Sequence, residues 1–268
     1  MIAIIRRAPV VSFAVVAYAI SWSPWFFSIA TGRHFGGIFP FGPMIAAFAV
    51  TAVAGGRSEV AQLGARLIRW RMPVIWWLAA ILIALAPLVV TGVGVSLLGG
   101  AAPNPVMLAK WPSVLATFPM VLILGGPLGE EIGWRGFGVS KLVGQGRRPL
   151  AAALTIGVVW AGWHLPLFLT HKMPPPAAIV MVIGAVTMAW LYLNSGESAL
   201  LLTAFHAIGN TLGGAWFFSL FAREDIMKVI LLRVAVEIVI AAAVMVFTGK
   251  ELGRRPVPSA ALGTQALA

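Results

Sequence analysis

The chain has 268 residues, of which 60% are hydrophobic and only 10% are charged. A soluble domain carries about a quarter charged residues, so this composition excludes an ordinary soluble domain. The absence of cysteine excludes disulfides, thiol catalysis and cysteine-bound metal. The net charge of +11 comes from basic residues in short loops between apolar runs. That pattern favours contact with anionic lipid headgroups, and we expect no nucleic-acid partner.

Eight apolar runs indicate membrane-spanning helices, because a helix needs about twenty mostly apolar residues to cross the hydrocarbon core. We therefore predict an all-α fold, a polytopic membrane bundle of about eight transmembrane helices. The predicted spans cover residues 10–30, 37–54, 73–98, 111–126, 150–169, 177–193, 198–220 and 226–247.

The remaining segments complete the predicted organisation. Residues 1–111 hold the N-terminal spans and a cytoplasmic amphipathic helix near 58–71, where leucines alternate with arginines at helical spacing. Residues 112–248 hold the polar motifs and the last span. Residues 249–268 have no core-forming pattern and are expected to be a flexible cytoplasmic tail.

The basic residues predict an orientation in the membrane. Thirteen of the nineteen Lys and Arg residues, including Arg135, fall in segments assigned to one side, five fall in the opposite loops, and Arg233 lies inside the last span. Because cytoplasmic loops carry the excess of basic residues, both termini are predicted to be cytoplasmic. We expect an integral, multi-pass protein of a bacterial inner membrane.

Glu130 and Glu131 stand side by side in a chain with only eight acidic residues. Acids in or near lipid are costly to keep, so such a pair indicates a functional site. On a helix Arg135 faces Glu131 as an i,i+4 pair, whereas Glu130 is rotated about 100° away. We expect Glu131 to pair with Arg135 and Glu130 to act as a base, and we count both acids among the catalytic candidates.

Two later spans carry polar pairs at i,i+4 spacing, Trp160 with His164 and His206 with Asn210. Pro166 removes a backbone donor and predicts a bend where His164 sits. Side chains from three helices can converge inside a bundle. A glutamate, two histidines and an asparagine form a set that can activate water and stabilise an oxyanion.

Three segments carry a resemblance to a known family. EEIGWR, WAGWH and HAIGN resemble the motifs E-E-x-x-x-R, F-x-x-x-H and H-x-x-x-N of the CPBP intramembrane proteases. That family includes the CAAX prenyl endopeptidases and bacterial members tied to bacteriocin processing or self-immunity. The resemblance covers about residues 112–214. One departure is Trp160 in place of Phe, which concerns the shape of the cavity more than catalysis.

The resemblance implies an eight-span bundle whose catalytic cavity opens to the cytosolic side. In that family the first-motif glutamate, here Glu130, activates water, and the second-motif histidine, here His164, helps to hold it. The third-motif residues His206 and Asn210 support the oxyanion, and we expect Arg135 and Trp160 to be structural supports. The implied partner is a peptide or lipidated protein substrate, CAAX-like or amphipathic.

Zinc is a candidate cofactor, because family members are often called metalloproteases. The candidate ligands are His164, His206 and Glu130, although the chain has no H-E-x-x-H motif. Two other functions remain open. One is a non-proteolytic membrane scaffold or bacteriocin self-immunity protein. The other is a proton-coupled transporter, for which the chain offers no paired broken helices.

Two further expectations concern positions inside the bundle. Counted from residue 150, His164 lies about 21 Å along its helix and beyond the membrane midplane. We therefore expect the start of that helix to project into the cytosol. Arg233 and Glu237 have i,i+4 spacing and are expected to form a buried structural ion pair.

Overall fold

The computed structural model describes residues 2–33 and 37–254, and in this part of the chain every regular element is helical. The all-α class is therefore confirmed. The elements are α1 Ile2–Arg7, α2 Pro9–Thr31, α3 Gly42–Leu67, α4 Val74–Leu97, α5 Pro105–Leu108, α6 Trp111–Ala116, α7 Phe118–Leu124, α8 Pro127–Glu131, η1 Ile132–Val139, α9 Ser140–Gly144, α10 Pro149–Trp163, α11 Leu165–Leu169, α12 Pro176–Asn194, α13 Ala199–Gly213, α14 Ala215–Ser219, η2 Arg223–Asp225, α15 Ile226–Thr248 and η3 Gly249–Glu251.

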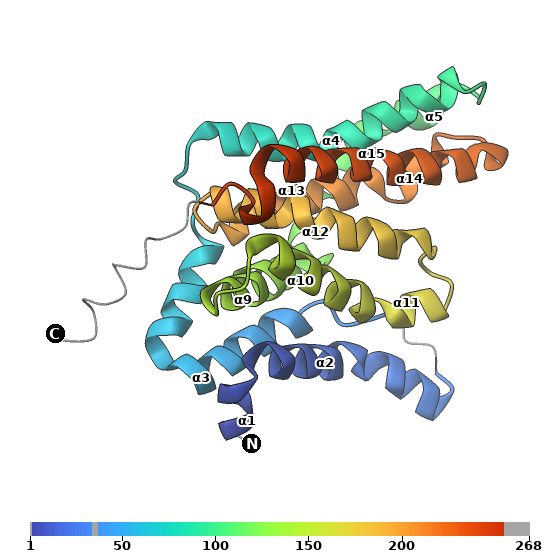
Figure 1. The fold of residues 1–268 in the computed structure, drawn as a ribbon. Coiled ribbons are helices and arrows are strands. Elements are labelled where there is room, and N and C mark those ends of the chain that lie inside the picture. The colour runs from blue at the N-terminus through green and yellow to red at the C-terminus, as the bar shows by residue number, and fades with distance from the viewer. Residues whose placement is uncertain (1, 34–36, 255–268) are drawn as a thin grey trace.

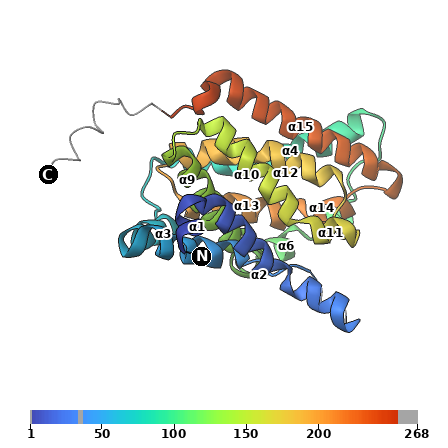
Figure 2. The ribbon, with the colours of Figure 1, turned by 60° about the horizontal axis from the view of Figure 1, so that its bottom comes forward.

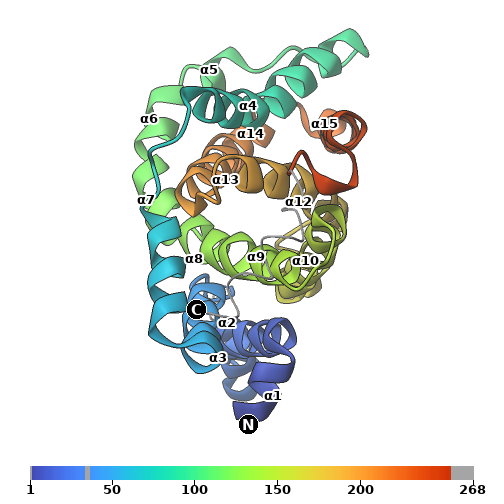
Figure 3. The same cartoon turned by 60° about the vertical axis from the view of Figure 1, so that its left-hand side comes forward.

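The long helices run side by side and form one bundle (Figure 1). Helix α2 packs on α3, α10 packs on α12, and α15 packs on both α12 and α4. Figures 1 and 2 place α10 and α12 between α2 on one side and α15 on the other. Viewed along the bundle, α8, α9, α10, α12 and α13 surround its centre (Figure 3). The polar motifs lie on these central elements.

A polytopic membrane protein fits the described helices. Five of them, α2, α3, α4, α12 and α15, are long and apolar enough to cross a membrane. A bent pair, Pro105–Ala116 with Phe118–Gly144, meets at 52° and makes a sixth if it is counted as one span. Large apolar side chains such as Val246 and Phe247 are exposed on the outside, as contact with lipid requires. The count of eight spans and the side of the termini remain predictions.

The fourth predicted span, residues 111–126, lies within the bent pair of helices and is interrupted. Residues 111–126 form the short helices α6 and α7, because Pro112, Pro119 and the pair Gly125-Gly126 interrupt the helix. The buried element begins later, at Pro127, and runs through α8, η1 and α9 to Gly144. The acid pair therefore lies on the buried helical unit that continues from α7.

The centre of this buried unit is a π-helix. All eight residues of η1, Ile132–Val139, are buried, and Arg135 lies among them with no exposed side chain. Arg135 therefore does not belong with the cytoplasmic loop residues to which its sequence position assigned it. π-Helical turns are rare and are often found at functional sites.

The basic segment near 58–71 is the second half of α3. This helix bends at Gly56, whose φ of 70° suits glycine, and ends at Leu67. Leu63 is buried, and Arg66 donates to the carbonyl of Gly136 and pairs with Glu197 at 2.7 Å. These contacts fasten the basic end of α3 to η1 and to the α12–α13 turn. Of the predicted tail, residues 249–251 form η3 and residues 255–268 lie outside the described residues.

Candidate active site

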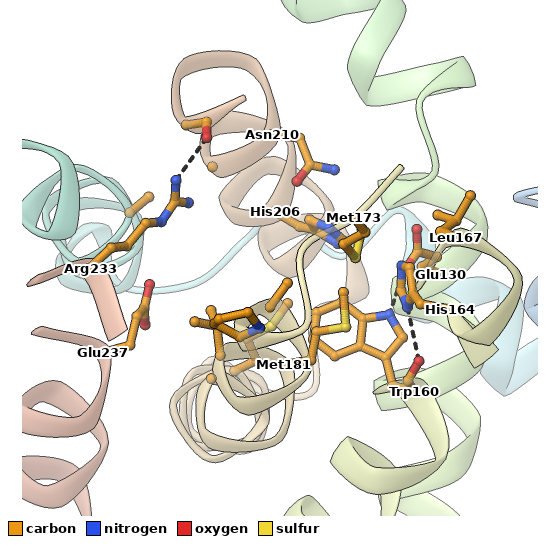
Figure 4. Close-up of a pocket in the computed structure, with 18 of the residues that line it drawn as sticks. Glu130, Trp160, His164, Leu167, Met173, Met181, His206, Asn210, Arg233 and Glu237 are labelled. Carbon is orange, nitrogen blue, oxygen red and sulfur yellow. Dashed lines mark hydrogen bonds between the residues drawn. The ribbon is translucent and has the colours of Figure 1, made fainter. Parts of the chain in front are cut away.

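A cavity of about 660 Å³ opens among the central helices, and the polar motif residues line it. Glu130 comes from α8, Trp160 and His164 come from α10 and its end, and His206 and Asn210 come from α13. Figure 4 shows Glu130, Trp160 and His164 on one wall and His206 with Asn210 on the next. Residues separated by up to 80 positions therefore share one space.

Glu130 is 5% exposed and faces this cavity. The indole Nε1 of Trp160 donates a hydrogen bond to its Oε2 at 2.6 Å. The other oxygen lies against Gly126, where a Cβ atom would come within 2.5 Å of Oε1. Gly126 also has a φ of 111°, which glycine adopts most readily. The carboxylate is thus fixed through one oxygen, and Oε1 is left for a proton from a bound molecule.

Glu131 is not among the residues that line the cavity, and it connects two elements. Its Oε1 accepts from Arg135 Nη1 at 3.0 Å, which confirms the predicted i,i+4 pair, and from His206 Nδ1 at 2.8 Å. Glu131 and Arg135 are both fully buried. Arg135 also lies 4.4 Å from the ring centroid of Trp160, a cation–π distance. Glu131 therefore holds η1 to α13 and fixes the ring of His206.

His164 lies at the break between α10 and α11, as the bend at Pro166 predicted. Its Nδ1 is 2.9 Å from the carbonyl of Trp160. Because a carbonyl only accepts, Nδ1 is the donor, and in the neutral ring Nε2 is then an acceptor. Trp163 packs edge-on against the ring at 4.8 Å. His164 therefore presents an oriented acceptor near Glu130.

His206, Asn210 and Gly213 follow one another at i, i+4 and i+7 on α13 and line the same cavity. His206 donates through Nδ1 to Glu131, so its Nε2 carries a proton only when the ring is an imidazolium. The Asn210 amide has no hydrogen-bond partner among the described residues and offers two donors to the cavity. This face of α13 can stabilise negative charge on a bound carbonyl oxygen.

The candidate zinc ligands do not form a metal site in this arrangement. Across residues 2–33 and 37–254, no three His, Asp or Glu side chains are grouped as a metal requires. Both Nδ1 atoms and Glu130 Oε2 are engaged by protein groups, and Glu131, which is near His206, is paired with Arg135. Zinc sites use at least three such ligands. The residues therefore do not fit zinc, and we derive no step through a metal.

The cavity lies toward the end of the bundle away from the basic residues. Its lining includes Leu124, Met173 and Pro174, which belong to the end of α7 and to the α11–α12 loop. The basic residues Arg147 and Arg148 lie at the other end of α10. The cytosolic opening and the cytoplasmic basic end, both expected from the sequence, remain predictions, and this position of the cavity favours only one of them.

Two contacts of the site were not predicted. The Glu131–His206 bond joins residues 75 positions apart, and the Trp160–Glu130 bond joins residues 30 positions apart. No local spacing encodes either contact. The Trp160–Glu130 hydrogen bond had one signal in the sequence, the replacement of the motif phenylalanine by Trp160. Indole has an N–H donor that phenylalanine lacks.

The expected ion pair between Arg233 and Glu237 is absent from the described structure. Both side chains line the cavity from α15 (Figure 4). The guanidinium turns instead to α13, where Nη1 donates to the carbonyl of Gly213 at 2.7 Å. The predicted direct ion pair is therefore not formed, although the opposite charges of Arg233 and Glu237 still interact at longer range.

Comparison with known proteins agrees with the motif residues. A family model described as type II CAAX prenyl endopeptidase Rce1-like matches residues 110–212. This segment contains the three motifs and every predicted site residue. Among curated proteins, none matches the chain.

Proposed function

Since residues 110–212 carry an Rce1-like domain of the CAAX protease family, we propose that this protein is an intramembrane endopeptidase that uses water activated by Glu130. The observation that carries the proposal is the meeting of Glu130, His164, His206 and Asn210 on the walls of one cavity. A carboxylate base, an imidazole acceptor and amide donors are the groups that amide hydrolysis needs.

In the first step, a water molecule between Glu130 and His164 gives one hydrogen bond to Glu130 Oε1 and one to His164 Nε2. Its lone pair then faces the scissile carbonyl carbon. As the oxygen–carbon bond forms, Glu130 takes the proton and the carbonyl oxygen becomes an oxyanion. Asn210 Nδ2 and, when its ring is protonated, His206 Nε2 donate to this oxyanion.

In the second step, the tetrahedral intermediate collapses and the carbon–nitrogen bond breaks. Glu130 returns its proton to the leaving amine, which restores the base and releases a carboxylic acid and an amine; the acid then loses its remaining proton to solvent. Trp160 keeps the Glu130 carboxylate in place during both steps, through the 2.6 Å hydrogen bond to Oε2. Glu131 has no part in the proton transfer and serves to hold His206 through Nδ1.

The substrate we propose is a peptide or a lipidated, CAAX-like protein segment. About two-thirds of the cavity-lining residues are apolar, which suits apolar side chains, and the surrounding helices face lipid. The excess of basic residues at the other end favours anionic headgroups and a cytoplasmic location there. In a bacterial inner membrane, the cavity would then receive its substrate from the opposite side.

The test uses purified protein in detergent and two synthetic heptapeptides that end in a CAAX sequence, one farnesylated and one not. Incubation in water enriched in ¹⁸O, followed by mass spectrometry, reports both the cleaved bond and the source of oxygen. We expect cleavage at one bond, with one ¹⁸O atom in the new carboxylate. Binding of a peptide without cleavage would favour the scaffold function and contradict the proposed one.

A further inference from the structure

Arg233 places a positive charge in the same cavity, at a distance from the proposed water site. It lies in α15, within a candidate membrane span, where an arginine is costly unless it is paired or functional. Its hydrogen bond to the Gly213 carbonyl is the one that it makes within the described chain. Glu237 lines the same cavity and interacts with this charge at longer range, without a hydrogen bond to it. A guanidinium has five donors, so most of its donors remain for a ligand.

The absence of a side chain at Gly213 leaves space for the guanidinium of Arg233. A Cβ atom on Gly213 would lie 2.7 Å from Nη2 and 3.0 Å from Nη1 of Arg233. Any larger residue at Gly213 would therefore push the guanidinium away from α13. Figure 4 shows Arg233 extending toward α13 across the cavity from Trp160 and Glu130.

The spacing along α13 bounds the distance between this charge and the proposed oxyanion site. Gly213 lies three residues after Asn210 and seven after His206 on the same helix face, which is a rise of about 4.5 to 10 Å at 1.5 Å per residue. An extended peptide covers this distance with about one to three residues at 3.3 Å each. A peptide whose scissile carbonyl lies near Asn210 and His206 can thus place a group about one to three residues further on beside Arg233.

We infer that Arg233, held against Gly213, binds the free C-terminal carboxylate of the peptide substrate. Guanidinium and carboxylate match in charge and geometry, and such charge-assisted hydrogen bonds are among the strongest in proteins. The inference rests on the proposed function for the identity of the ligand. In this role Arg233 binds the C-terminus of the substrate peptide. The distance from Arg233 to the proposed base then determines how many residues separate the C-terminus from the cleaved bond.

The test compares the binding of one CAAX-type peptide as the free acid and as the C-terminal amide. Binding to the wild-type protein is followed by quenching of tryptophan fluorescence, since Trp160 and Trp163 line the cavity. We expect the acid to bind about tenfold to a hundredfold more tightly than the amide, as a hydrogen-bonded charge pair implies. The Arg233→Gln variant should bind both forms as weakly as the wild type binds the amide.

Two more variants make the test specific. Gly213→Ala, which keeps the charge and displaces the guanidinium, should reduce the preference for the acid. Lys172→Gln removes an exposed positive charge beside Met173 of the cavity lining and should leave the preference unchanged. Thermal unfolding of each variant tests whether it is folded. The comparison of acid and amide on the wild-type protein needs no variant, so it does not depend on any variant folding.

Equal binding of acid and amide by the wild type would overturn the inference, and so would a preference that survives Arg233→Gln. If Arg233 instead binds a lipid phosphate, added phosphatidylglycerol will compete equally with both peptides, which also overturns it. Cleavage of both peptides without a preference for the acid would leave the proposed function standing. A preference for the acid without cleavage would support the role of Arg233 and contradict the proposed function.

Discussion

The indole Nε1 of Trp160 donates to Glu130 Oε2 at 2.6 Å, and the same ring contacts both histidines of the site. Its centroid lies 5.8 Å from that of His164 and 5.6 Å from that of His206, with Arg135 stacked at 4.4 Å. One side chain thus touches the proposed base, both imidazoles and the buried cation. The replacement of the motif phenylalanine by Trp160 therefore adds a hydrogen bond that orients Glu130.

Trp160→Phe removes this N–H and keeps an aromatic ring over Arg135. We expect kcat to fall about tenfold with little change in KM, because one buried hydrogen bond to a charged group is lost and substrate contacts remain. Steady-state cleavage of the CAAX peptide measures this. The matched control is Trp163→Phe, since Trp163 Nε1 has no partner in the described structure. Equal losses in both variants would contradict the orienting role.

Glu131→Gln is expected to destabilise the protein. The change leaves Arg135 fully buried without its counter-charge, which costs about 3–5 kcal/mol for a buried pair. Thermal unfolding in detergent should show a lower Tm. Adding Arg135→Met to Glu131→Gln should recover part of the loss, because the unpaired charge is removed. A Glu131→Gln protein with wild-type Tm and no activity would instead place Glu131 in the proton transfer.

The side of the membrane that the cavity faces can be read by cysteine labelling, because the chain has no cysteine of its own. Lys172→Cys lies beside the cavity and Arg148→Cys lies at the basic end. In intact bacterial cells, an impermeant maleimide should label Lys172→Cys, and Arg148→Cys only after permeabilisation. The reverse pattern would restore a cytosolic opening and show that the basic residues do not follow the usual rule.

Removal of metal should leave cleavage unchanged, because the site residues do not form a zinc ligand set. Activity after treatment with a chelator, combined with metal analysis of the purified protein, measures this. Loss of activity with the chelator and its return with zinc would mean that His164, His206 and Glu130 rearrange to bind metal.

The contacts that could be predicted from the sequence are those between residues one helical turn apart. The i,i+4 spacing gave the Glu131–Arg135 pair and separated Glu130 from it, and Pro166 gave the break at His164. The same spacing failed for Arg233 and Glu237, because a nearby carbonyl on α13 competes for the guanidinium. The Glu131–His206 bond depends on how α13 packs on α8, and local sequence does not record packing between distant helices.

The interruption of the fourth span was not predicted, for a related reason. An apolar run at 111–126 has the composition of a span, yet its prolines and glycines break it into short exposed helices. The buried part of this region, residues 127–144, contains two acids and an arginine. Charges that satisfy one another within a bundle can be buried where composition predicts exposure.

The most direct test of the central claim is the cleavage rate of Glu130→Gln. Glutamine keeps the size of the side chain and can still accept from Trp160, but it cannot take a proton from water. We expect kcat to fall about a thousandfold or more, with peptide binding and Tm retained. Glu237→Gln, the matched change at the other acid that lines the cavity, should retain activity. A Glu130→Gln protein that cleaves the peptide at more than about a tenth of the wild-type rate would contradict the account.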